Sequence, residues 1–517
     1  MPAALVPRPS TLRETGAGFH VRPSTKLRFD PASAEVAHLL RQQLTPATGF
    51  SLLSGNLTDD VGDAIALTVD GRIGPSAYEL EANTEGVRIS GGDVAGLFHG
   101  TQTLRQLLPP QIFRRTTVSD VDWYVPGIEI ADRPRFAWRG MLLDVSRHFF
   151  GLEMVLKLID LLALHRMNVL HLHLTDDQGW RIEIKRYPRL TDIGSWRARS
   201  MIGSSQDARR FGAKYDETPH SGFFTQDDIR EIVAYAAERF ITVIPEIDVP
   251  GHSQAAIAAY PELGNTGTRL PVRTDWGVNT HVLNVSDETI AFYKGVLEEV
   301  LTLFPGVFIH VGGDEVPKDE WQASPLAQER IRELGLAGED ELQSWFITQL
   351  SDFLTDRGRR PVGWDEILEG GLPRGAMVMS WQGESGGIAA ARLGHDVVMT
   401  PDPVLYLYHH QSDPAVEPPG VPPIVDLRSV YAYEPVPTEM TEADATHVLG
   451  AQCQMWTEFV VSPRQLQEMV FPRLCAFSEV VWAERKDSFA AFERRLGSHK
   501  ERLKALDVSV FEGRPLS

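Results

Sequence analysis

Residues 151–176, with the sequence GLEMVLKLIDLLALHRMNVLHLHLTD, decide the fold class of this chain. Residues 151–167 place apolar side chains at the spacing of an amphipathic helix, and Val169–Asp176 follows as an apolar strand. A strand this apolar is typical of a parallel sheet that is covered on both of its faces. The stretch therefore predicts one helix–strand unit of an α/β fold.

The same unit recurs before and after this stretch, from residue 136 onward. Further helices are predicted over 226–239, 287–303, 340–357 and 463–483. Eight units over about 350 residues predict a catalytic (β/α)₈ TIM barrel in residues 133–517, with helices at its C-terminal end. The predicted barrel strands are Trp138–Ser146, Val169–Asp176, Ile241–Val249, Val307–Gly312, Arg360–Trp364, Ala376–Trp381, His395–Thr400 and Val448–Trp456.

The segments outside these units are predicted to form loops and a separate N-terminal domain. Residues 191–225 and 401–447 show no clear helix and are expected to be loops on the active face of the barrel. Residues 1–132 predict a small, non-catalytic α+β domain, in which strands precede a helix that ends before two prolines. Its predicted elements are strands at Ala64–Val69, Tyr78–Ala82 and Gly86–Gly91 and a helix over 93–108.

Composition excludes several classes of protein. The net charge of −20 argues against binding to nucleic acid, which requires clustered basic residues. Two cysteines, Cys453 and Cys475, are too few for a disulfide scaffold and lie in apolar surroundings, so buried thiols are expected. No segment has the length and apolar character of a membrane span. The N-terminus lacks the pattern of a signal peptide, so a cytoplasmic location is expected, or secretion if a leader precedes the numbered sequence.

In a barrel of this kind the active site lies where the strands end. The predicted strand ends carry carboxylates together with an arginine, a histidine, a tyrosine and three tryptophans. Indole rings stack on the apolar faces of sugar rings, and carboxylates accept hydrogen bonds from sugar hydroxyls. The pattern predicts a sugar pocket, with candidate residues Asp144, Arg147, Asp176, Asp177, Glu246, Asp248, His252, Asp314, Glu315, Trp364, Glu366, Trp381, Tyr406, Trp456 and Glu458.

Some of these features also have a simpler structural interpretation. A tryptophan at a strand end is usually part of the core, and Arg147 could neutralise Asp144 or Asp176 without touching a ligand. His171 and His173 point to one face of a strand, as in metal-dependent hydrolases built on barrels. That function needs histidine ligands on later strands, and the fifth and sixth strands have none. We therefore expect no metal and no cofactor, and activity that a strong chelator does not change.

Six segments, taken in their order and spacing, match one known family. They resemble the family 20 glycoside hydrolases, the β-N-acetylhexosaminidases, and the resemblance covers most of the chain. The segments are Arg139–Phe149, His171–Trp180, Pro250–His252, His310–Glu315, Gly363–Glu366 and Trp456–Glu458.

The resemblance implies roles for the residues of the reaction. Glu315 would be the general acid/base, and Asp314 would orient the 2-acetamido group of the substrate and stabilise its developing positive charge. Tyr406 would donate a hydrogen bond to the acetamido oxygen. Asp176 and His252 would form a chain that tunes Glu315.

The resemblance also implies which residues bind the sugar. Trp364, Trp381 and Trp456 would wall the acetamido pocket, and Arg147 and Glu458 would bind ring hydroxyls. The implied function is that of an exo-acting, retaining β-N-acetylhexosaminidase. It would release terminal β-linked GlcNAc, and GalNAc, from amino-sugar oligosaccharides such as chito-oligosaccharides or glycoconjugates.

The adjacent pair Asp314-Glu315 supports this mechanism independently. A retaining enzyme with a protein nucleophile needs two carboxyl groups about 5–5.5 Å apart on either side of the bond. Two consecutive residues at one strand end cannot easily adopt that arrangement. In substrate-assisted catalysis, by contrast, the N-acetyl oxygen is the nucleophile and an oxazolinium ion forms. Gly312-Gly313 would allow a tight turn there, and apolar tryptophans together with Asp314 should raise the pKa of Glu315.

One position departs from the family pattern. Two residues after Tyr406 the family typically has an acid that contacts outer hydroxyls of the sugar, and Tyr408 stands there in this chain. We expect Glu458 alone to carry those contacts, which leaves the choice between GlcNAc and GalNAc open. Two other functions remain open, release of a disaccharide or of a 6-substituted GlcNAc. A sugar-binding barrel without catalysis would lack the acid, and Glu315 is present.

Overall fold

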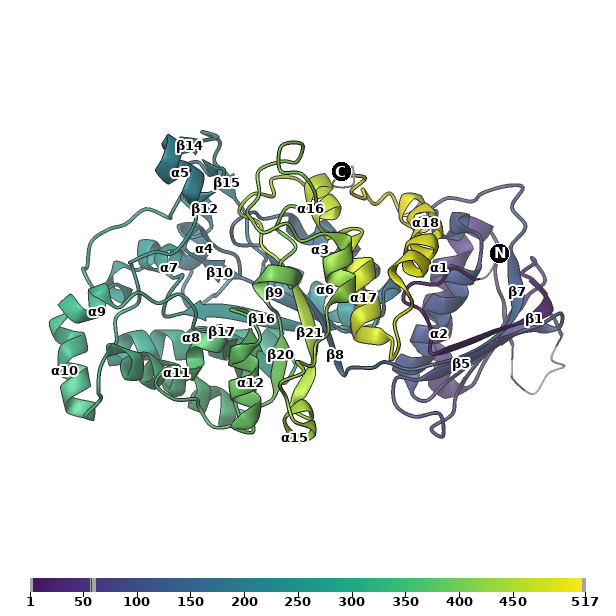
Figure 1. The fold of residues 1–517 in the computed structure, drawn as a ribbon, viewed down its shortest axis with the longest axis horizontal. Helices are drawn as coiled ribbons and strands as arrows, with labels where there is room; N and C mark the ends of the chain where they lie inside the picture. The colour runs from purple at the N-terminus through teal and green to yellow at the C-terminus, as the bar shows by residue number, and fades with distance from the viewer. Residues whose placement is uncertain (1–2, 56, 58–61, 514–517) are drawn as a thin grey trace.

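The computed structural model describes residues 3–55, 57 and 62–513. Figure 1 shows two lobes, a smaller one formed by the first part of the chain and a larger one that contains the barrel. The predicted architecture, a TIM barrel preceded by a small α+β domain, is confirmed. Within the described ranges, no helix is long and apolar enough to cross a membrane.

The smaller lobe is a seven-stranded sheet with helices α1 (Ala34–Thr48) and α2 (Val94–Leu107). Helix α2 begins at Asp93, whose carboxylate accepts a hydrogen bond from the Gly96 amide, as an N-cap does. The three predicted strands are present, but the sequence analysis missed α1 and four strands. The sheet order is β1 (Thr11–His20), β7 (Tyr124–Asp132), β5 (Tyr78–Ala82), β6 (Gly86–Gly91), β4 (Ala64–Val69), β2 (Lys26–Phe29) and β3 (Ser54–Gly55).

The larger lobe is built on a closed barrel of eight parallel strands. All eight strands lie within the predicted segments, because most of their residues are apolar, as burial on both faces requires. In chain order they are β8 (Trp138–Asp144), β9 (Val169–His173), β16 (Thr242–Val249), β17 (Phe308–Gly312), β18 (Arg360–Trp364), β19 (Met377–Ser380), β20 (Val397–Met399) and β21 (Val448–Met455).

Helices alternate with these strands and surround the barrel. Side-chain caps fix where several of them begin: Thr225 and Asp228 form a capping box at α6, and Ser286 caps α8. The main helices are α3 (Gly151–Leu164), α6 (Gln226–Ala237), α8 (Asp287–Leu303), α11 (Glu339–Thr355), α12 (Ser385–Arg392), α16 (Pro463–Val470) and α17 (Arg473–Trp482).

Two predictions about helices were wrong. The helix predicted over 463–483 is two helices, α16 and α17, because Pro472 between them has no amide hydrogen to continue the ladder. The stretches expected to lack helices contain short ones, which span too few residues to show a period in sequence. They are α4 (Arg189–Asp192), α5 (Ser205–Phe211), α13 (Asp402–Leu405), α14 (Leu427–Ala432) and α15 (Glu442–Ala445).

The last helix, α18 (Phe489–Ala505), joins the two lobes: it contacts the short 3₁₀ helix η2 (Pro110–Phe113) of the smaller lobe, and Figure 1 shows it where the lobes meet. Arg502 of α18 donates to the carbonyl oxygens of Ala4, at 2.8 Å, and Gln106, at 2.7 Å. The indole nitrogen of Trp482 donates to Asp132 at 3.0 Å. The lobes are therefore joined by buried polar contacts.

Candidate active site

A tight turn after β17 carries the two carboxylates that the sequence singles out. Gly312 and Gly313 have φ angles of 70° and 98°, and Glu315 has a φ of 47°, which is rare for a residue with a side chain. A Cβ on Gly312 would lie 1.6 Å from a carboxylate oxygen of Asp248. The turn leaves 14% of the Asp314 side chain and 33% of the Glu315 side chain exposed.

His252, which follows β16, faces both of these carboxylates. Its Nε2 lies 3.6 Å from Asp314 Oδ2 and 3.5 Å from Glu315 Oε2, and its Nδ1 lies 3.3 Å from Asp176 Oδ1. Burial alone would lower the pKa of His252, but the charge of Asp176 and of the other two carboxylates raises it well above the usual value. The ring is therefore protonated at neutral pH and binds three acidic side chains.

The pKa values of the adjacent pair move in opposite directions. Burial raises the pKa of Asp314 to about 6, against the opposing charge of His252. Burial also acts to raise the pKa of Glu315, but the cationic His252, 3.5 Å away, outweighs it, so that this pKa lies below the usual value. The prediction of a raised pKa for Glu315 was therefore wrong, because the charge of His252 outweighs the apolar tryptophans and Asp314 on which that prediction rested.

Arg147 lies beside this group and holds two buried carboxylates. Its Nη2 lies 2.8 Å from Asp176 Oδ2, and its Nη1 lies 3.4 Å from Asp144 Oδ2. The guanidinium carbon lies 5.1 Å from the centre of the Trp456 ring. Arg147 thus neutralises buried carboxylates, as its simpler interpretation predicted. It also lies over Trp456, one of the predicted pocket residues.

The predicted aromatic residues form one continuous wall. Trp381 stacks on Tyr406 with 6.2 Å between ring centres, and Tyr406 lies 6.0 Å from Trp456. Trp456 in turn lies 6.0 Å from Trp364. Trp364 is fully buried, whereas Trp381 is only half-buried. The structure thus brings all three tryptophans and the tyrosine together, from the ends of different strands.

Glu246 of β16 is the centre of a buried network under this wall, a role that the sequence analysis missed. His173 Nδ1 lies 2.5 Å and His310 Nδ1 3.0 Å from its oxygens, and the indole nitrogen of Trp364 donates to it at 2.8 Å. Strand register offered a signal, because Glu246 is level with His173 and His310 in the parallel ladder. The network fixes the orientation of Trp364.

Several groups of histidines and acids in the barrel could hold an ion, and one of them includes Glu246. Potential ligand atoms of His171, Glu246 and His310 lie within 4.8 Å of one another. His171 Nε2 lies 3.2 Å from Glu246 Oε2. Both oxygens of Glu246 already face ring or indole nitrogens, so the histidines have carboxylate partners without an ion.

Glu458 and Tyr408 form the far side of the pocket. Oε2 of Glu458 is buried and has no hydrogen-bond partner in the part of the chain that the structure describes. Burial raises the pKa of Glu458 to about 7, against the opposing charge of Arg147. Tyr408 stacks on Phe459 with 6.1 Å between ring centres and meets Tyr406 edge-on at 5.9 Å. Glu458 therefore offers an unused acceptor, next to a neutral phenol.

A cavity of about 290 Å³ lies just outside this pocket. Glu315, Trp381 and Glu366 line it together with Lys318 and Val278. The Trp381 indole nitrogen donates to Glu366 at 2.8 Å, and burial raises the pKa of Glu366 to about 8. The Glu315 carboxylate is thus open toward this cavity.

Comparison with known proteins agrees with this geometry. The chain is 43% identical to a β-hexosaminidase from Porphyromonas gingivalis over 505 residues, 96% of this chain, and spans 63% of that relative's length. A solved β-N-acetylhexosaminidase from Streptomyces coelicolor superposes with a TM-score of 0.85 at 31% identity, covering 99% of this chain and 98% of that one. A mutant β-hexosaminidase from Streptomyces plicatus, solved with its product GlcNAc, gives a TM-score of 0.84 at 31% identity, covering 99% and 97%.

Two family domains account for most of the sequence. Residues 3–133 match domain 2 of glycosyl hydrolase family 20, and residues 136–485 match the catalytic domain of that family. The chain therefore belongs to glycosyl hydrolase family 20, as its motifs predicted.

Proposed function

We propose that the protein is an exo-acting, retaining β-N-acetylhexosaminidase that uses the acetamido group of its substrate as the nucleophile. The observation that carries this proposal is that Asp314 and Glu315 both face the same nitrogen of His252, at 3.6 and 3.5 Å. They therefore approach the sugar from one side, which suits an acid/base beside a carboxylate that binds an amide. The product bound to the Streptomyces plicatus relative, GlcNAc, supports an amino sugar as the substrate.

The proposed reaction has two steps. Glu315 donates a proton to the glycosidic oxygen while the amide oxygen attacks the anomeric carbon, so the leaving group departs and an oxazolinium ion forms. The Asp314 carboxylate accepts the amide N–H and faces the positive charge of that ion. Glu315 then takes a proton from water as the water oxygen opens the oxazolinium, which restores the amide and retains the configuration.

The first test is a panel of substrates together with one variant. The enzyme should hydrolyse aryl β-GlcNAc and leave the matching aryl β-glucoside intact, because the glucoside lacks the internal nucleophile. Glu315→Gln should lower kcat about 10²–10⁴-fold on a glycoside with a poor leaving group and leave the Tm unchanged. Comparable turnover of the glucoside, or a near-normal rate in the variant, would overturn the proposal.

We further propose that Glu458 alone binds the outer hydroxyls of the sugar. Its buried, unpartnered Oε2 and the neutral Tyr408 beside it support this assignment. Glu458→Gln should raise KM for β-GlcNAc, whereas Tyr408→Phe should change it much less. The idea fails if KM in Glu458→Gln equals that of the wild type. Comparing β-GalNAc with β-GlcNAc in both variants shows which side chain distinguishes the 4-hydroxyl.

Release of a single sugar is favoured over release of a disaccharide. Tyr406 is 5% exposed and stacked on Trp381, and this packed wall supports a pocket that accepts a single terminal ring. Aryl β-GlcNAc should be hydrolysed faster than an aryl disaccharide glycoside in which the terminal linkage is blocked. A 6-sulfated GlcNAc glycoside, in the same assay, tests the alternative of a 6-substituted substrate.

A further inference from the structure

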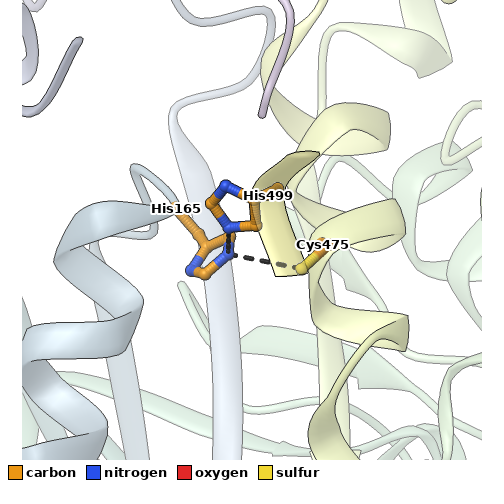
Figure 2. Close-up of side chains that lie close together, drawn as sticks. All are labelled: His165, Cys475 and His499. Atoms are coloured by element: carbon orange, nitrogen blue, oxygen red, sulfur yellow. Dashed lines mark hydrogen bonds between the residues drawn. The ribbon is translucent and has the colours of Figure 1, made fainter. Parts of the chain in front are cut away.

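A second group of chemically reactive side chains lies far from the active site, where α18 meets the barrel. Figure 2 shows His165, which follows α3, beside Cys475 of α17 and His499 of α18, pointing toward one another. All three side chains are fully buried. Three helices from distant parts of the chain therefore supply two imidazoles and a thiol to one point.

The ligand atoms of this cluster are close enough to share an ion. The Nε2 atoms of His165 and His499 lie 2.9 Å apart, and Cys475 Sγ lies 3.4 Å from His165 Nε2. The three ligand atoms lie within 4.8 Å of one another. Around a three-coordinate ion with bonds of about 2.0 Å to nitrogen, two nitrogens stand roughly 3.5 Å apart. A small rotation of either ring is enough to provide that spacing.

The orientation of His165 is already that of a metal ligand. Its Nδ1 donates to the carbonyl oxygen of Leu161 at 2.7 Å, so its Nε2 presents a lone pair to the cluster. His499 must carry its proton on Nδ1 when it binds an ion. Here that nitrogen accepts a long hydrogen bond from Arg502 Nη1 at 3.4 Å; binding an ion would break this bond, while Arg502 keeps its shorter bond to Ala4 at 2.8 Å.

We propose that His165, Cys475 and His499 form a closed, three-coordinate site for Cu(I). A soft thiolate with two imidazoles is a ligand set that suits Cu(I) or Zn²⁺. Charge selects between the two ions. On binding, the thiol proton is released and an S–Cu bond forms, so that one thiolate and Cu⁺ leave a neutral centre. Zn²⁺ would leave a net positive charge buried beside Arg502, at a high desolvation cost, and three protein ligands would leave its fourth position open.

Such a site would tie α18 to the barrel. Because all three side chains are fully buried, the ion must enter while the chain folds or while α18 is displaced. Activity on an aryl glycoside should not depend on it, since none of the three residues belongs to the active site. No metal was expected from the sequence, because only the strand ends were considered as a source of ligands and Cys475 was predicted only as a buried thiol.

The test measures the metal content of the full-length protein. Wild-type protein made in copper-supplemented cells and purified without chelators should contain about one copper per chain by mass spectrometry. Cys475→Ser should lose it. Cys453→Ser is the matched control, because Cys453 is equally buried but lies outside the cluster. X-ray absorption of the wild type should show two nitrogens and one sulfur at about 2.0 and 2.3 Å.

Several outcomes would overturn the proposal. These are a wild type with only trace copper, equal copper in Cys475→Ser and Cys453→Ser, or an absorption spectrum without sulfur. Zinc in place of copper, in cells given both metals, would overturn the charge argument. If Cys475→Ser does not fold, the absorption spectrum of the wild type still decides. With no metal bound, the three side chains are a hydrogen-bonded cluster in which His499 donates to His165.

Discussion

At the scale of single residues, the adjacent carboxylates have different environments because one cation lies between them. His252 lowers the pKa of Glu315 below its usual value, while burial holds that of Asp314 at about 6. The pair holds one proton in either of two forms. The proton is on His252 beside an ionised Glu315, or on Glu315 beside a neutral His252. The proton needed by the leaving group is thus shared by the pair, and its pKa belongs to both groups.

Asp314 should set the acid limb of the pH profile. Its carboxylate must be ionised to stabilise the oxazolinium, and its raised pKa means that the fraction ionised falls as the pH drops through about 6. We expect kcat/KM to fall below that pH. Asp314→Asn should lose about 10²–10³-fold in kcat and no longer show that limb. If kcat/KM of the variant still falls below the same pH, the acid limb belongs to another group.

His252 should set the basic limb. In the wild type the shared proton is lost only as the pH rises through the raised pKa of His252. In His252→Gln the proton resides on Glu315 alone, an acid, so the basic limb of kcat/KM should move to lower pH. An unchanged limb would show that Glu315 receives its proton from elsewhere. The measurement is the pH at which kcat/KM begins to fall on the basic side. If His252 were only structural, the variant would be slower at every pH and this pH would not move.

At the scale of elements, the turn after β17 depends on the absence of a side chain at Gly312. A Cβ there would meet Asp248 at 1.6 Å, and the φ of 70° is unfavourable for any other residue. Asp248 of the neighbouring strand β16 thus packs against the backbone that positions Asp314 and Glu315. Packing beneath the turn, as much as the turn itself, therefore positions the two carboxylates.

Gly312→Ala should therefore lower both stability and activity. Strain of about 1–2 kcal/mol for the left-handed backbone adds to about 1–3 kcal/mol for the forced contact. Gly335→Ala is the matched control, since it has a similar φ of 66° and nothing within 4 Å of the added Cβ. Urea denaturation should show a larger loss for Gly312→Ala, with kcat reduced only in that variant. Equal losses in both variants would rule out the contact with Asp248.

Much of the fold could be predicted at this scale, and the exceptions have physical causes. Barrel strands are visible because each is buried on both faces, so its sequence alone shows an apolar run. Strand β1 is mostly exposed, and the short loop helices span too few residues for a period. The candidate catalytic residues could be named from motifs. The resemblance also linked His252 to Glu315, but the direction of the Glu315 pKa shift could not be predicted, because it depends on how close the charge of His252 comes, here 3.5 Å.

At the scale of the whole molecule, charged groups are buried where the two lobes meet. Arg166, which is fully buried, lies 3.9 Å from the Asp132 carboxylate and donates to the carbonyl oxygen of Pro7 at 2.9 Å. The same carboxylate accepts hydrogen bonds from Tyr78, at 2.8 Å, and from Trp482, at 3.0 Å. The lobes should therefore unfold together.

Arg166→Met should test this coupling. It leaves the Asp132 carboxylate buried without its cation, a change that typically costs about 3–5 kcal/mol. Chemical denaturation should show a lower midpoint and a single transition by both fluorescence and circular dichroism. The exposed Arg494→Ala should change the midpoint little. Two separate transitions in Arg166→Met, or no loss of stability, would contradict a coupled interface.

The contact between Arg502 and Ala4 has a consequence for synthesis in the cell. The two residues are 498 positions apart in sequence, and Arg495 likewise donates to the carbonyl of Leu5 at 3.1 Å. A ribosome makes Ala4 first and Arg502 hundreds of residues later, at about 5–20 residues per second. The segment around Ala4 must therefore wait tens of seconds for its partner. During that interval the nascent smaller lobe exposes the surface that α18 later covers, which makes it a site where a chaperone would act.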